Sequence, residues 1–120
     1  MVKQPENPQV KELLSSVEQE ALQELKRRLI DQFPFIEELI LFGSVVRGEA
    51  DEESDVDLLV LTNRKLDRSR RHEITGVVFK VNLEYDTNFS ALVADRENWD
   101  SGVVSVLPIH TEIEQHGVPV

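Results

Sequence analysis

The chain of 120 residues contains no cysteine, which excludes a disulfide framework and a thiolate zinc site. It contains no apolar run long enough to span a membrane, and its first residues, MVKQPENP, lack the apolar centre of a signal peptide. Positive charge is scarce, with 13 Lys and Arg residues against 23 Asp and Glu residues and a formal net charge of −10. These absences predict a cytoplasmic protein that neither inserts into membranes nor binds nucleic acid directly.

The distribution of apolar residues and of residues that break secondary structure predicts a single domain. Residues 1–8 are expected to form a flexible N-terminal tail because two prolines discourage regular structure. Residues 9–120 are expected to form the domain. Apolar residues at helical spacing predict one helix over residues 10–32. Pro34 ends this helix, and residues 35–42 are predicted to form the first strand.

A sharp turn is predicted directly after this first strand. Gly43 lets the backbone turn tightly and approach a ligand closely. Ser44 is a suitable N-cap for a short helix beginning at Val45, and free N–H groups at such an end attract phosphate. Arg47 lies on the same side of the turn, where it either contacts phosphate or pairs with a nearby acid. Gly48 is predicted to end the turn.

Two aspartates mark the start of the second predicted strand, which contains the apolar residues 58–61. Asp55 and Asp57 point to the same face of a strand, with α-carbons about 6.7 Å apart. Their carboxylates can therefore converge on one hard cation, and a divalent ion such as Mg2+ would remove their repulsion. A D-x-D pair on its own is more often a pair of solvated acids.

The combination of both motifs is more specific than either part. Residues 43–48 read GSVVRG and residues 54–60 read SDVDLLV. This pattern resembles the signature of the minimal nucleotidyltransferases (MNT proteins) in the DNA polymerase β-like nucleotidyltransferase superfamily. The resemblance implies an α/β (α+β) fold in which a small mixed β-sheet is flanked by helices.

The resemblance also implies roles for individual residues. Asp55 and Asp57 would be catalytic and would bind the metal, Mg2+ or Mn2+. Gly43, Ser44 and Arg47 would bind the nucleotide.

The activity implied by the resemblance is transfer of a nucleoside monophosphate to a hydroxyl acceptor. AMP from ATP is the first choice, and other nucleoside triphosphates remain open. MNT proteins are often paired with HEPN proteins in toxin–antitoxin modules, so the acceptor is expected on a HEPN-type partner; a homo-oligomer is also left open. The alternative is a catalytically weak or inactive nucleotide-binding antitoxin or regulatory subunit that acts by protein–protein contact. A transferase for a small molecule ranks last because no second domain is expected.

The third carboxylate of the family's catalytic members is missing from its expected place. Residues 67–86 fit a helix capped by Asp67, whereas the alternation of their second half fits a strand. The resemblance favours the helix, which makes residues 88–94 the neighbouring strand, and this strand contains no acid. If residues 67–86 were instead a strand, Glu84 or Asp86 could supply the third catalytic carboxylate, and Glu84 is the candidate named here. Without that group, nucleotide and metal would bind while transfer would be slow or absent.

Two charged segments allow two interpretations each. The acidic residues 49–53 either supply further metal ligands or form a solvated loop, and the solvated loop is expected; Ser54 is predicted to hold it through a bond to the backbone. A basic cluster either contacts phosphates or an acidic partner, or is surface charge. Its members are Arg64, Lys65, Arg68, Arg70, Arg71 and His72.

The C-terminal part is predicted to contain a loop and a helix. Residues 96–99 are expected to form a loop or short turn, in which Trp99 is an anchor in the core or at its edge. Residues 107–115 are predicted to form a final helix with a proline start and a glycine stop. His110 and His116 are expected to be surface residues.

Overall fold

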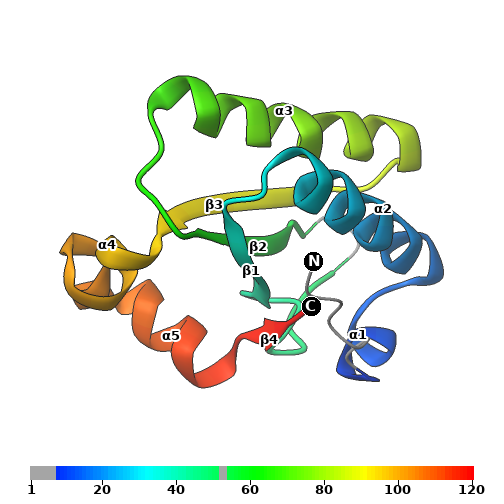
Figure 1. Ribbon diagram of the computed structural model, residues 1–120. Coiled ribbons are helices and arrows are strands. Elements are labelled where there is room, and N and C mark those ends of the chain that lie inside the picture. Colours follow the sequence, from blue (N-terminus) through cyan, green and yellow to red (C-terminus); the bar gives the residue numbers. More distant parts are fainter. Residues whose placement is uncertain (1–7, 52–53) are drawn as a thin grey trace.

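The computed structural model describes residues 8–51 and 54–120 as a four-stranded mixed sheet with helices on both faces (Figure 1). The strand order is β3-β2-β1-β4. The elements in chain order are α1 (Pro8–Leu13), α2 (Ser16–Gln32), β1 (Ile36–Phe42), β2 (Val56–Thr62), α3 (Arg68–Tyr85), β3 (Phe89–Asp95), α4 (Arg96–Ser101), the 3-10 helix η1 (Val103–Val106), α5 (Pro108–His116) and β4 (Val118–Pro119). The expected fold class, a small mixed sheet flanked by helices, is therefore confirmed.

The N-terminal helical region is divided, so the prediction of one helix over residues 10–32 was wrong. Ser15 interrupts it and caps α2: its hydroxyl accepts a hydrogen bond from the Glu18 N–H (3.1 Å), and the Glu18 carboxylate accepts one from the Ser15 N–H (2.9 Å). This reciprocal capping box fixes the start of α2. Pro8 begins α1, and the rest of the predicted tail lies outside the described residues.

The central strands bury side chains on both faces of the sheet. On one face, Leu41 of β1 and Leu58 of β2 belong to the apolar core that includes α2 and α3. On the other face, Leu59 and Leu61 pack with Trp99 of α4 and with α5. Because side chains alternate along a strand, the continuous apolar run of β2 divides between these two helical layers.

The strand pairing brings the two sequence motifs together. β1 and β2 are antiparallel, and Phe42 at the end of β1 pairs with Asp57 near the start of β2. β2 and β3 are parallel and are joined through α3, with Asp57 opposite Ser90. The short strand β4, which the sequence did not predict, pairs with β1 at Ile40 and Leu41.

The later helices confirm two predictions and correct a third. α3 is a helix, and the Asp67 carboxylate caps it by accepting from the Arg70 N–H (2.8 Å). α5 also forms as predicted and ends at Gly117. Residues 96–99 are helical instead of a loop because Asp95 accepts from the Asn98 N–H (3.0 Å) and caps α4. Within the described part of the chain, no helix has the length and apolar character needed to span a membrane.

Candidate active site

The turn between β1 and the acidic loop has an unusual backbone at both ends. Gly43 has φ +83° and Gly48 has φ +73°, both in the left-handed region that favours glycine. Between them, the Arg47 N–H donates to the Gly43 carbonyl (3.2 Å) and the Glu49 N–H donates to the Ser44 carbonyl (2.9 Å). The short helix expected after Ser44 is thus a hydrogen-bonded turn over residues 44–48.

Gly43 also lies directly against the aspartate pair. A β-carbon added to Gly43 would overlap the Oδ2 atom of Asp57. Only glycine satisfies both this contact and the positive φ. The predicted phosphate-binding turn and the predicted metal-binding carboxylate are therefore parts of one site.

The two aspartates differ in their surroundings. Strand alternation places Asp57 on the sheet face that carries Leu59 and is covered by α4 and α5. Asp55 directly precedes β2, and its charge acts on Asp57. The Asp55 Oδ1 atom accepts a hydrogen bond from Asn88 Nδ2 (2.5 Å). Burial raises the pKa of Asp57, the Asp55 charge raises it further, and Glu112 adds to the effect, whereas Arg47 lowers it. The ionised pair is therefore unfavourable by itself and favours a cation.

Two acids hold the side chain of Arg47. Its Nε donates to Glu49 Oε2 (3.1 Å), and its Nη1 contacts Glu112 Oε1. These two carboxylates, with Glu49 as the larger cause, raise the pKa of Arg47. The structure thus shows the acid-paired alternative for Arg47. Glu112 had no sequence signal, because it reaches the site from α5 only through the tertiary fold.

The donor chemistry of the site fits Mg2+ that arrives with a phosphate ligand. Mg2+ in proteins is commonly bound by one or two carboxylates together with substrate phosphates, and Asp55 and Asp57 supply two carboxylates. Among residues 8–51 and 54–120, no group of three or more His, Cys, Asp or Glu side chains could hold a metal ion. The remaining ligands would therefore come from substrate and water. Glu52 and Glu53 of the acidic loop lie outside the described residues.

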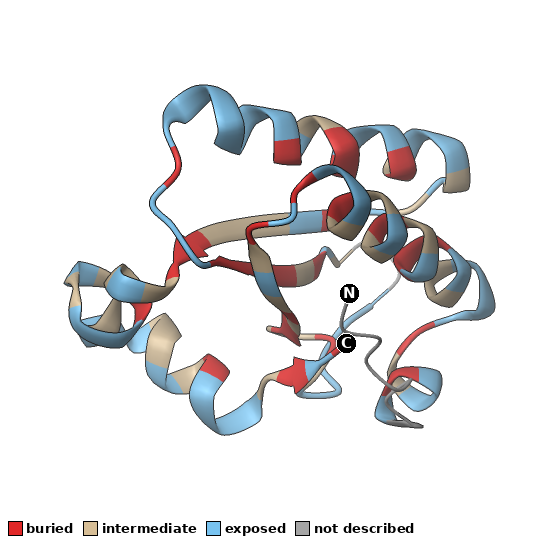
Figure 2. Ribbon diagram, viewed as in Figure 1, coloured by how far each residue is buried: buried red, intermediate tan, exposed pale blue. Residues whose placement is uncertain are grey.

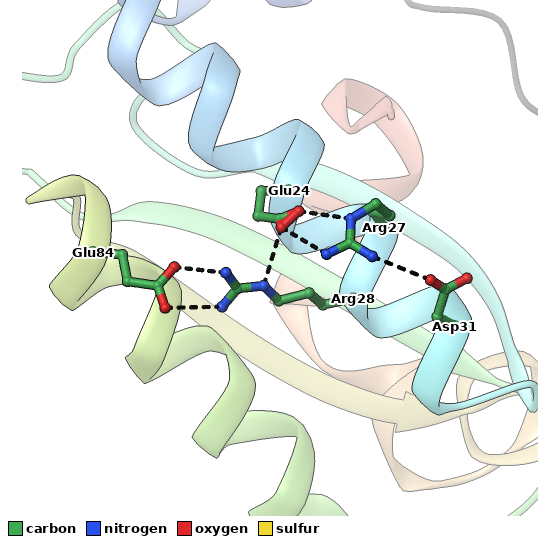
Figure 3. Close-up of polar contacts among 5 residues, drawn as sticks. All are labelled: Glu24, Arg27, Arg28, Asp31 and Glu84. Atoms are coloured by element: carbon green, nitrogen blue, oxygen red, sulfur yellow. Dashed lines mark hydrogen bonds and ion pairs between the residues drawn. The ribbon is translucent and has the colours of Figure 1, made fainter.

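The strand next to β2 places a hydroxyl, and no carboxylate, opposite Asp57. Ser90 is opposite Asp57 on the neighbouring strand β3. Glu84 was a candidate only if residues 67–86 formed a strand, and they form α3. Its carboxylate instead binds Arg28 of α2, with Nη2–Oε2 at 2.6 Å and Nη1–Oε1 at 3.4 Å (Figure 3). The structure therefore does not bring Glu84 into contact with the aspartates.

The charged segments flanking β2 lie at opposite ends of this strand. In the acidic loop, the Ser54 hydroxyl accepts from the Asp51 N–H (3.1 Å), as predicted. The basic cluster follows the C-terminal end of β2, so the length of the strand, roughly 20 Å, separates it from the aspartates. Within the cluster, Arg64 lies over the Phe35 ring, 5.2 Å from its centroid. The cluster is not part of the aspartate site.

Trp99 and the two C-terminal histidines, His110 and His116, differ in how far they are buried. Trp99 is 1% exposed and donates from Nε1 to Glu114 Oε1 (2.7 Å), which confirms its role as an anchor. His110 was predicted to be a surface residue, and this prediction was wrong. Its side chain is only 19% exposed, and the centroid of its ring lies 4.4 Å from that of the Trp99 ring. His116 is exposed.

Most of the chain matches a known protein family. The model of the nucleotidyltransferase domain family matches residues 22–106. The chain belongs to this nucleotidyltransferase family.

Two proteins of Methanocaldococcus jannaschii that carry the provisional name protein adenylyltransferase are similar in sequence. MJ0141 is 32% identical over 85 residues, which are 71% of this chain and 79% of that protein. MJ1305 is 34% identical over 101 residues, which are 81% of this chain and 64% of that protein.

Solved structures share the nucleotidyltransferase fold. A toxin–antitoxin structure with AMP-PNP has a TM-score of 0.57 at 22% identity, covering 83% of this chain and 69% of that chain. A complex of tri-AMPylated HEPN toxin with MNT antitoxin from Shewanella oneidensis has a TM-score of 0.52 at 20% identity, covering 84% and 69%. A Sulfolobus solfataricus protein, provisionally described as a nucleotidyltransferase, has a TM-score of 0.52 at 19% identity, covering 88% and 86%. At these identities the likeness establishes the fold alone.

Proposed function

We propose that this nucleotidyltransferase moves AMP from ATP to a hydroxyl group of a partner protein, for which a HEPN-type toxin is the first candidate. The observation that carries the proposal is the contact between the Gly43 turn and Asp57. It joins backbone N–H groups suited to phosphate with carboxylates suited to a divalent cation. The provisional names of the archaeal relatives, protein adenylyltransferases, support the choice of AMP and of a protein acceptor.

Each residue of the site has a proposed task. Asp55 and Asp57 hold the cation, and the Asn88 amide fixes the orientation of the Asp55 carboxylate. The turn after Gly43 holds the β- and γ-phosphates through its N–H groups. When bound, Mg2+ or Mn2+ orients the triphosphate and stabilises the negative charge on the departing pyrophosphate. The acceptor oxygen forms a bond to the α-phosphorus while the bond to pyrophosphate breaks, and the hydroxyl proton passes to solvent.

In the proposed reaction, Arg47 exchanges its carboxylate partners for phosphate. In the structure it is held by Glu49 and Glu112. A bound triphosphate offers Arg47 a stronger, multiply charged acceptor close to the same turn. We propose that Arg47 leaves Glu112 for the nucleotide. The positive charge of Arg47 is then available to phosphate only when a nucleotide is bound.

A second function is supported by a specific observation at the same site. Ser90 occupies the position opposite Asp57 on β3, and Glu84 is engaged by Arg28. A chain without a third carboxylate would bind nucleotide yet transfer slowly. It would then act as an antitoxin or regulatory subunit through contact with its partner.

A transfer assay distinguishes these two functions. The purified chain is incubated with Mg2+, ATP labelled at the α-phosphate and an extract of the source organism, and labelled proteins are separated on a denaturing gel. The proposal expects a labelled acceptor with the wild type and with Asp100→Asn, an exposed acid of α4, and none with the double variant Asp55→Asn/Asp57→Asn. Absence of label with the wild type, while ATP and Mg2+ still bind, would contradict the transferase and favour the contact antitoxin.

A further inference from the structure

Helix α5 brings one carboxylate to the edge of the candidate active site. Ile113 of α5 is buried together with Phe42 of β1 and Leu59 of β2, and Phe42 pairs with Asp57. The preceding residue, Glu112, is partly buried, with 34% of its side chain exposed. Figure 2 shows α5 at the edge of the molecule, with most of its outer side exposed. The packing of Ile113 therefore fixes the backbone of Glu112 near the aspartates, while its carboxylate stays accessible.

Glu112 lies close to Asp57 without sharing a metal site with it. The raised pKa of Asp57 is caused mainly by burial and by Asp55, and the charge of Glu112 adds to both. Arg47, which contacts Glu112 Oε1 through Nη1, acts on Asp57 in the opposite direction. Within residues 8–51 and 54–120, no three acidic or histidine side chains are grouped so that they could hold one ion. The Glu112 carboxylate is therefore left for a task other than metal binding.

The two carboxylates that hold Arg47 differ in their relation to the aspartates. Glu49 belongs to the acidic loop, and its side chain is 65% exposed. Glu112 comes from a packed helix, and of the two only Glu112 is among the charges that act on Asp57. When the phosphates of a nucleotide take Arg47, Glu112 loses its cation but stays near the aspartates. A carboxylate released in this way can accept a proton from a reacting group.

An open depression of about 500 Å3 adjoins Glu112, between α5 and the turn after Gly43. Its lining residues are Arg47, Pro108, Thr111, Glu112, Gln115 and His116. A serine, threonine or tyrosine hydroxyl that enters this depression would come next to the Glu112 carboxylate. Sites for small molecules enclose most of the ligand surface, whereas this depression is open to the outside. It therefore suits a hydroxyl that is presented by another protein.

We propose that Glu112 is the general base that takes the proton of the acceptor hydroxyl. This inference rests on the proposed transfer of AMP and on the exchange of partners by Arg47. The acceptor oxygen forms a bond to the α-phosphorus, its proton passes to Glu112, and the bond to pyrophosphate breaks with its electron pair on the pyrophosphate. Glu112 then releases the proton to solvent. Because ATP must first draw Arg47 away, the base becomes available only when the nucleotide is bound.

The variant Glu112→Gln separates the chemical step from nucleotide binding. Glutamine keeps the size of the side chain and still accepts a hydrogen bond from Arg47, but it does not take up a proton. With ATP labelled at the α-phosphate and an extract of the source organism, transfer of label should fall about 100-fold or more. Calorimetry should give a Kd for Mg2+–ATP no weaker than that of the wild type, which also shows that the variant is folded. Glu114→Gln is the matched control on the same helix: its Oε1 atom still accepts from Trp99 Nε1, and transfer should match the wild type.

Glu49→Gln tests whether Glu112 serves only to hold Arg47. This variant alters the other carboxylate partner of Arg47, so the proposal expects its loss of transfer to be at least about tenfold smaller than that of Glu112→Gln. Equal losses in the two variants, wild-type transfer in Glu112→Gln, or loss of Mg2+–ATP binding in Glu112→Gln would overturn the role of Glu112 and leave the proposed function standing. Absence of label with the wild type would overturn both.

Discussion

Carboxylates in two regions of this molecule have pKa shifts of opposite sign. On α2, Glu24 accepts hydrogen bonds from Arg27 (2.7 and 2.8 Å) and Arg28 (3.2 Å), which lower its pKa to about 2 (Figure 3). In the candidate active site, burial and the neighbouring Asp55 raise the pKa of Asp57. The acid on α2 finds its cations within the chain. For the acid in the site, burial and a second acid outweigh the nearby Arg47, so a bound cation would stabilise its charge.

The close approach of Gly43 to the Asp57 carboxylate can be broken by one methyl group. In Gly43→Ala, the β-carbon would displace the Asp57 carboxylate, and we expect nucleotidyl transfer to fall about 100-fold or more. Both Gly43→Ala and the control Gly48→Ala place alanine at positive φ, which costs about 1–3 kcal/mol of stability. Transfer by Gly48→Ala should stay within a few fold of wild type, since its β-carbon meets nothing within 4 Å. Equal losses of activity in the two variants would show that the contact with Asp57 is unimportant.

Arginine substitutions compare the two regions directly. We expect Arg47→Gln to weaken binding of Mg2+–ATP about tenfold, because one charge-assisted contact to phosphate is lost. Arg28→Gln should leave nucleotide affinity unchanged, because Arg28 binds Glu24 and Glu84 on the other side of the sheet. Isothermal titration calorimetry measures both constants. Unchanged affinity in Arg47→Gln would exclude its proposed exchange between Glu112 and phosphate.

Removal of the Asp57 charge should stabilise the protein without ligand. The pKa of Asp57 is raised in the folded chain above its usual 3.8, so ionisation costs stability as the pH rises through and above that value. We expect Asp57→Asn to have a higher Tm than the wild type at neutral pH and the same Tm below about pH 4. Addition of Mg2+ and ATP should raise the Tm of the wild type only. A lower Tm of Asp57→Asn at neutral pH would contradict the sign of the shift.

The smallest effect is expected on α2. The pKa of Glu24 is lowered from 4.5 to about 2, so its contribution to stability is complete above pH 4.5 and is lost as the pH falls toward 2. Glu24→Gln should therefore lower the Tm at neutral pH by at most about 4 °C, because ion pairs at a helix surface contribute little. The difference from wild type should shrink between pH 4.5 and 2. A constant difference across this range would show that the Glu24 charge is not responsible.

Local signals in the sequence predicted most of the elements, and two missed boundaries also had local signals. The helix break at Ser15 is marked by the sequence SSVE, a capping box whose Glu18 reaches back. The start of α4 is marked by Asp95, which caps it. In both places the capping residue, and not the apolar pattern, marks where the helix begins. The outward Phe79 and Leu83 made α3 resemble a strand, because their side chains do not serve its own core.

The sequence by itself determined the turn at Gly43, the buried strand that carries Asp57, and the family, because glycine conformations and apolar runs are local properties. Only the tertiary structure decided that Glu112 holds Arg47, that Asn88 holds Asp55 and that Glu84 is taken by Arg28. These contacts join residues from different elements. Their distances depend on how the helices pack on the sheet, which no spacing along the chain specifies.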